Sequence, residues 1–165
     1  METRGSETAP ARASLGADAM AYIGSVSLLG LIASCATMLA GPIEFGVEFL
    51  VLCGLAVALG SRTVRLWSTV EMSGALPFIY AALLGHGPAA ATLVSLLAAL
   101  GACTIRSRRL NLPRILFNTS VIAGTTVAAA WTYLWMGGET GQVHLGMSFW
   151  PLLASTLVYY MLNTA

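Results

Sequence analysis

Six long apolar runs alternate with short polar segments along this chain. The runs cover residues 19–39, 44–60, 70–84, 89–105, 115–136 and 147–165. A helix needs about 20 largely apolar residues to cross the hydrocarbon layer of a membrane. The runs do not alternate polar and apolar residues, as the strands of a membrane barrel do. The pattern therefore predicts an all-α fold: a polytopic membrane helical bundle with about six transmembrane helices.

The two ends of the chain differ in character. Residues 1–18 are polar and small, with mixed charges and a proline, which predicts a disordered cytosolic tail. Residues 19–165 then form a single transmembrane domain. Because the last run reaches residue 165 without a polar exit, we interpret the chain as truncated within the sixth span.

Composition supports a membrane location. Hydrophobic residues make up 57% of the chain and charged residues only 9%, whereas soluble domains have roughly 25% charged residues. The surplus apolar surface needs a lipid bilayer around it. The net charge of +1 gives no indication of a nucleic-acid partner. The cysteines lie inside apolar runs without ligand spacing, so we expect no metal site, disulfide or cofactor.

The arginines define the expected topology. The chain has eight arginines and no lysine, and in a six-span arrangement all of them fall on one side. Cationic residues near span ends stay cytoplasmic during insertion, which places the N-terminus inside. A rival interpretation of the cluster after residue 105 is a site for anionic lipid or nucleotide phosphate. The arginines that follow the predicted spans are Arg62, Arg65, Arg106, Arg108, Arg109 and Arg114.

Ionisable groups within membrane spans are functional candidates, because burying them in lipid is costly. Glu44 and Glu48 lie four residues apart, on one face at the outer start of the second run. Two interpretations stay open: an interfacial capping pair, or part of a pH-sensing or cation-binding cluster with His86 and with Glu139 or His144. In the cluster interpretation, Glu48→Gln should shift the response.

Two further polar positions lie deeper in the predicted spans. Glu71 starts the third run near the cytoplasmic side, where it is a candidate partner for nearby arginines. Asn118 lies early in the fifth run, where two interpretations are open: a hydrogen bond between helices, or a contact to a ligand. Small residues four apart predict close helix packing, at Gly30/Ser34, Gly54/Ala58 and Gly124/Ala128.

No catalytic motif was found, so we do not expect this chain to be an enzyme. One short motif, LIASC at residues 31–35, resembles a lipoprotein cleavage box ending at Cys35. The apolar run continues to Leu39, where a mature lipoprotein would normally become polar. We therefore treat the first span as retained.

Three segments carry a family resemblance. The stretch EMSGALPFIYAALLGHGPAAATLVSLLAALGA, the arginine cluster, and LFNTSVIAGTTVAA follow one another in this order. Together they resemble the N-terminal multi-span region of bacterial signalling proteins, which precedes HD-type phosphohydrolase or diguanylate cyclase output domains. The family pattern usually has a small residue and a glutamine after the asparagine, where this chain has Thr119 and Ser120.

The resemblance implies a membrane sensory or anchoring domain that relays a signal to a cytosolic output domain outside this chain. It also implies the bacterial cytoplasmic (inner) membrane as the location. The expected partners are the lipid bilayer, that output domain in cis, and a second copy of the chain in a homodimer. The alternative function is the substrate-binding membrane component of a vitamin-type uptake transporter, a likeness at the level of fold only.

Overall fold

Six helices and one short hairpin make up the computed structural model, which describes residues 16–67, 70–106, 112–141 and 145–164. The elements are α1 (Ala17–Ala40), α2 (Val47–Gly60), β1 (Thr63–Trp67), β2 (Val70–Ser73), α3 (Leu76–His86), α4 (Pro88–Arg106), α5 (Leu112–Trp135) and α6 (Leu145–Thr164). The helical architecture predicted from the sequence is confirmed, whereas the hairpin was not predicted. The predicted tail lies almost wholly outside the described residues.

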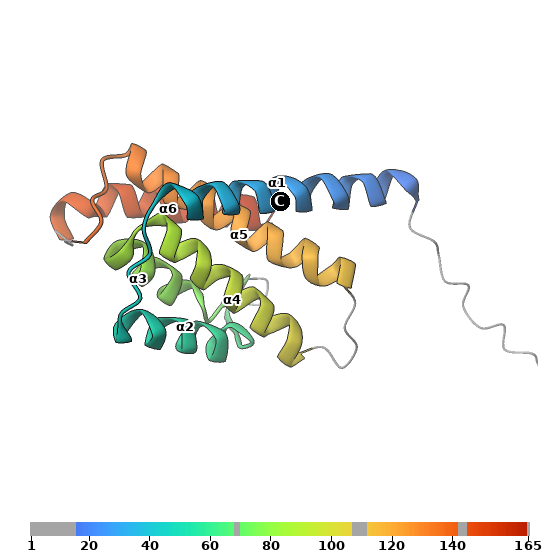
Figure 1. Cartoon of the computed structure of the whole chain (residues 1–165), viewed down its shortest axis with the longest axis horizontal. Coiled ribbons are helices and arrows are strands. Elements are labelled where there is room, and N and C mark those ends of the chain that lie inside the picture. Colours follow the sequence, from blue (N-terminus) through green and yellow to red (C-terminus); the bar gives the residue numbers. More distant parts are fainter. Residues whose placement is uncertain (1–15, 68–69, 107–111, 142–144, 165) are drawn as a thin grey trace, which may run out of the picture.

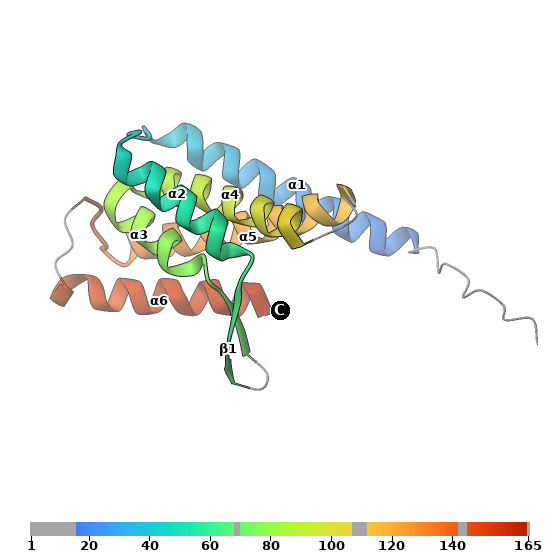
Figure 2. The same cartoon turned by 90° about the horizontal axis from the view of Figure 1, so that it is seen from below.

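The helices run back and forth along one long axis (Figures 1 and 2). The connections α1–α2, α3–α4 and α5–α6 lie at one end, which we call the acidic end because it carries Glu44, Glu48 and Glu139. The hairpin, the start of α5 and the end of α6 lie toward the other, the arginine end, which includes Arg62 and Arg114. This alternation is the one that the distribution of arginines predicts.

Helix α5 is central to the bundle. Its interfaces with α6, α1 and α4 are the three most extensive between helices in the described part of the chain. In the most apolar stretches, 50% of residues are buried in α4 and 44% in α5, against 11% in α1. The start of α1 extends beyond the other helices in Figure 1. Helix α1 therefore lies at the periphery of the bundle, and most of its apolar surface needs apolar surroundings outside the bundle.

Small side chains form much of the core. Its buried cluster joins α2, α3, α4 and α5, and includes Ala56, Ala82, Ala90, Ala91, Ala98 and Ala130 together with Phe49, Ile79, Leu83, Val94 and Tyr133. Alanine lets helix backbones approach closely, which is how helices associate where lipid removes the hydrophobic driving force. The predicted packing position Gly30 lies directly on α5, since a Cβ there would meet the Ser120 carbonyl oxygen at 2.4 Å. The Gly54 position packs on nothing within 4 Å.

The predicted six full-length spans need correction. In the described part of the chain, α1, α4 and α5 are long and apolar enough to cross a membrane. Helices α2 and α3 have 14 and 11 residues, about 21 and 16 Å at 1.5 Å per residue, which is shorter than the roughly 30 Å hydrocarbon layer.

The predicted third span, residues 70–84, is wrong because its first residues form a strand. Strands β1 and β2 pair antiparallel, and their TVRLW and VEMS sequences contain the β-branched and aromatic residues that favour strands. The hairpin extends away from the helices in Figure 2. At its base, the Gly74 N–H donates to the Arg62 carbonyl oxygen at 3.0 Å. Pro77 starts α3 rather than interrupting it, because the first turn does not need its missing N–H.

Candidate functional site: two clefts at opposite ends of the bundle

A cleft of about 480 Å³ opens at the acidic end, and we call it the Glu44–His86 cleft. Its walls come from the end of α1, the α1–α2 connection, the α3–α4 junction, the end of α5 and the α5–α6 connection. The lining residues are Thr37, Ala40, Gly41, Pro42, Glu44, Gly85, His86, Gly87, Pro88, Ala89, Trp131, Leu134, Thr140 and Gly141. Segments that are far apart in sequence therefore build one site.

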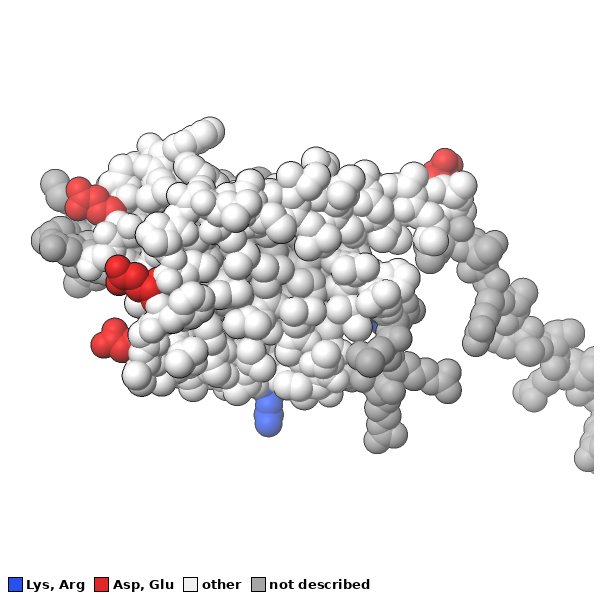
Figure 3. All heavy atoms as spheres, in the orientation of Figure 1, with Lys and Arg blue, Asp and Glu red and all other residues white. Residues whose placement is uncertain are grey.

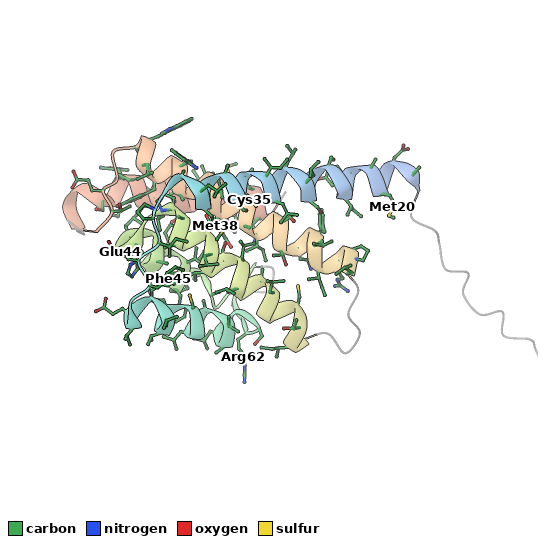
Figure 4. All side chains as sticks on the ribbon, viewed as in Figure 1. Met20, Cys35, Met38, Glu44, Phe45 and Arg62 are labelled. Atoms are coloured by element: carbon green, nitrogen blue, oxygen red, sulfur yellow. The ribbon has the colours of Figure 1, made fainter. Side chains whose placement is uncertain are left out.

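Two of the predicted outer-side candidates meet in this cleft. Glu44 and His86 both line it, although they come from different connections. His86 is half-buried and its ring packs edge-on against Phe49, with ring centroids 5.5 Å apart. Glu48 is exposed in the first turn of α2 and does not line the cleft. Figure 4 shows Glu44 beyond the end of α1, where the chain turns toward α2.

Hydrogen bonds hold the walls of the cleft in place. The Trp131 Nε1–H donates to Thr37 Oγ1 at 3.4 Å, which links α5 to α1. The buried Tyr133 hydroxyl donates to the Glu139 carbonyl oxygen at 2.8 Å. The Gly141 N–H donates to the Leu84 carbonyl oxygen at 2.7 Å, which ties the α5–α6 connection to α3. Sequence reasoning missed Trp131, Thr37 and Thr140 as wall residues. The only available signal was a tryptophan near a span end.

A second cleft, of about 710 Å³, opens at the arginine end between α4, α5 and α6. We call it the Arg114 cleft. It is lined by Ala99, Ala102, Cys103, Arg114, Ile115, Phe117, Asn118, Val121, Ile122 and Asn163. The predicted candidates Arg114 and Asn118 thus lie in one cleft, one turn apart on α5. The interpretation of Asn118 as a contact in a cleft is the one that this geometry favours.

The other predicted positions are placed less completely. Arg62 is exposed beside the base of the hairpin (Figure 4). The hairpin register makes Arg65 and Glu71 backbone partners, with Cα atoms paired across the two strands. Arg106 ends α4. Arg108, Arg109 and His144 lie outside the described residues.

Few charged groups interrupt the surface of the bundle. In the view of Figure 3, acidic atoms gather at one end, one acidic group lies near the start of α1, and Arg62 projects from the lower edge between them, where Figure 4 labels it. Most of the remaining surface drawn in this view is uncharged. Many large apolar side chains are exposed along that surface, among them Leu28, Leu29 and Ile32 of α1, Leu50 and Val51 of α2, and Leu153 and Leu157 of α6. An uncharged belt of this kind suits lipid.

The two clefts differ in the charge of the groups that line them. Among the described residues, no three His, Cys, Asp or Glu side chains form a group able to hold a metal ion. The Glu44–His86 cleft offers one carboxylate, one imidazole and an indole, while the Arg114 cleft offers one guanidinium and two carboxamides. Helix α5 contributes side chains to both clefts.

A family comparison agrees with this arrangement. No curated protein and no solved structure matches the chain. The MASE9 family model matches residues 32–165, which covers most of the helical region. MASE domains are membrane-associated sensory domains. The chain, with its lipid-suited belt and a cleft at each end, belongs to the MASE9 family of membrane-associated sensory domains.

Proposed function

We propose that this chain is the sensory and anchoring domain of a bacterial signal-transduction protein in the inner membrane. Its stimulus binds in the Glu44–His86 cleft, and its output leaves at the arginine end toward a cytosolic domain in cis. The observation that carries this proposal is α5, which lines the first cleft with Trp131 and the second with Arg114. A helix that forms part of both sites transmits a displacement from one to the other.

The proposed orientation has the N-terminus, the hairpin and the arginine end in the cytoplasm. Helices α1, α4 and α5 cross the bilayer, and the shorter helices α2 and α3 pack against α4 without needing to span it. Trp135 is 85% exposed and Trp150 is 66% exposed, and Trp135 ends α5 while Trp150 lies near the start of α6. Such residues suit the outer membrane interface. Tyr159 lies near the end of α6, where an interfacial aromatic residue of the inner side would be expected, but its side chain is buried.

The lining of the Glu44–His86 cleft favours a small cation. Glu44 supplies a carboxylate, and Trp131 supplies an aromatic ring, which attracts cations through its π face. None of the described residues that line the cleft is an arginine. Backbone turns and apolar side chains of the α3–α4 junction complete the wall. Inorganic cations and small alkylammonium ions share the chemistry that this lining recognises.

Binding is tested with choline chloride and a single tryptophan. In nanodiscs, a variant with Trp67, Trp135 and Trp150 replaced by phenylalanine leaves Trp131 as the only indole. We expect a saturable change in Trp131 emission with choline chloride, beyond that given by equal sodium chloride. Glu44→Gln should weaken the affinity for choline about tenfold, because it removes one charge-assisted contact of ~1.4 kcal/mol. Glu48→Gln is the matched control, because Glu48 does not line the cleft.

The relay has its own readout at the opposite end. With Cys35 and Cys53 replaced by alanine, Cys103 of the Arg114 cleft is the only thiol. Choline chloride should change the rate of Cys103 alkylation in the wild-type cleft and not in Glu44→Gln. Equal emission curves for Glu44→Gln and Glu48→Gln would refute the proposed binding site. A Trp131 response to choline with an unchanged rate of Cys103 alkylation would refute the proposed relay. Net uptake of radiolabelled choline into proteoliposomes would favour the transporter alternative.

Orientation is tested by labelling in intact cells. Cysteine introduced at Arg108 should be unreactive toward an impermeant maleimide until the cells are opened. Cysteine introduced at Glu139 should react in intact cells. The opposite result would reverse the two sides of the domain and place the Glu44–His86 cleft in the cytoplasm.

A further inference from the structure

The Arg114 cleft combines a positive potential with a partly apolar wall. Arg114 lies in the first turn of α5, a 24-residue helix with no acidic residue in that turn. The N-terminus of a helix carries the positive end of the helix dipole, so a cation there is unfavourable and an anion is favourable. The guanidinium and the helix end therefore add their potentials at the same place.

The polar groups of this cleft are available to a ligand. Arg114 is exposed and Asn118 is half-buried. Within the described residues, no carboxylate lines the cleft, and the carboxamides of Asn118 and Asn163 line it together with the Arg114 guanidinium. Carboxamides donate N–H groups to an anion, and a guanidinium binds phosphate oxygens in a bidentate manner.

The apolar part of the wall indicates what the anion is attached to. Ile115, Phe117, Val121 and Ile122 line the cleft from α5. The volume of about 710 Å³ is much larger than a bare phosphate needs. The cleft therefore suits a phosphate group with an apolar or glycerol-like body attached.

We propose that the Arg114 cleft binds a phosphate group, with Arg114 as its main contact and Asn118 and Asn163 as hydrogen-bond donors. The phosphate belongs to an anionic lipid headgroup or to a soluble phosphate compound, which share this chemistry. Because α6 also lines the cleft through Asn163, an occupant holds the start of α5 against the end of α6. The evidence for this site does not depend on which ligand binds at the acidic end.

Alkylation of Cys103 measures occupancy, because this thiol lines the cleft. The chain with Cys35→Ala and Cys53→Ala is placed in phosphatidylcholine nanodiscs with increasing phosphatidylglycerol. We expect slower Cys103 alkylation as phosphatidylglycerol increases. A second arm adds inorganic phosphate to nanodiscs of phosphatidylcholine alone. Protection in the first arm only identifies the lipid headgroup, and protection in the second arm identifies a soluble phosphate.

Variants assign the effect to the cleft. Arg114→Gln should raise the phosphatidylglycerol fraction for half-protection about fivefold, which corresponds to ~1 kcal/mol for one basic residue near an anionic surface. Arg114→Lys should retain part of the protection. Arg62→Gln is the matched control, since Arg62 is exposed and does not line the cleft.

Two outcomes would overturn the proposal. One is a Cys103 rate that neither phosphatidylglycerol nor inorganic phosphate changes. The other is equal protection in Arg114→Gln and Arg62→Gln. These experiments contain no choline chloride, so a negative result would not bear on the proposed cation site in the Glu44–His86 cleft. Likewise, a Trp131 emission that choline chloride leaves unchanged would not bear on the proposed phosphate site in the Arg114 cleft.

Discussion

The contact between α1 and α5 at Gly30 gives the sharpest prediction about the packing. A Cβ at position 30 would lie 2.4 Å from the Ser120 carbonyl oxygen and 2.9 Å from the Ser120 carbonyl carbon. Both are backbone atoms inside a helix, so no rotamer change can relieve the contact. Gly30→Ala must therefore move α1 away from α5, and we expect this variant to be destabilised.

The cost follows from the displacement. Restoring an ordinary contact of about 3.5 Å requires a shift of about 1 Å. A gap of that size removes roughly a quarter to a half of each contact's attraction of ~0.1–0.2 kcal/mol. Over on the order of 30 contacts along the α1 face, this amounts to ~1–3 kcal/mol, which is the range usual for overpacking. The buried Ser34 and Thr37 lie on the α1 segment that would move.

A matched control lies on the same helix. A Cβ at Gly24 meets nothing within 4 Å, so Gly24→Ala adds no clash. Both substitutions gain helix propensity, by up to about 1 kcal/mol, because alanine favours the helix more than glycine does. The difference between the two variants isolates the steric cost. We expect thermal unfolding in detergent micelles, followed by circular dichroism, to occur about 2–12 °C lower for Gly30→Ala than for Gly24→Ala. Equal midpoints would show that α1 does not rest on α5 at Ser120.

Two further predictions concern the hairpin base and the wall of the Glu44–His86 cleft. Gly74→Ala should destabilise the chain by ~1–3 kcal/mol, because its Cβ would lie 2.6 Å from the Leu59 carbonyl oxygen; unfolding in micelles checks this against Gly54→Ala, whose Cβ has open space. Tyr133→Phe should cost ~0.5–1.5 kcal/mol by leaving the Glu139 carbonyl without its donor. It should also weaken choline binding measured by Trp131 emission, and unchanged stability and binding would show that this bond does not support the cleft.

The sequence predicted the alternation of the chain better than the lengths of its helices. Arginine distribution reports which connections share a side, and that information is local to each connection. Helix length at residues 70–84 depends instead on whether Val70–Ser73 pairs with a neighbouring strand, a contact made with Thr63–Trp67. Apolar β-branched residues are compatible with a strand or a membrane helix, so hydropathy alone could not separate the two.

The candidate sites show the same division between local and non-local information. Glu44 and His86 were identified by residue type, because ionisable groups next to apolar runs are conspicuous in any sequence. Their meeting in one cleft depends on the α1–α2 connection and the α3–α4 junction lying side by side, which no spacing in the sequence encodes. Trp131 was missed for a related reason, since an indole near a span end reads as an interfacial anchor until its neighbours are known.

Helix α5 carries several hydroxyl groups in an otherwise apolar sequence. Two of its buried hydroxyls donate to carbonyl oxygens of the same helix, Ser120 to Leu116 at 2.7 Å and Thr126 to Ile122 at 2.8 Å. These bonds are kept when the helix shifts against its neighbours, so such a shift costs packing but not these hydrogen bonds. Near the acidic end, the bond from Trp131 to Thr37 is at 3.4 Å and links α5 to α1 only weakly. A ligand beside Trp131 would therefore compete with one weak bond and with the packing of α5 on α1, so a small binding free energy would suffice to shift the proposed sensor helix.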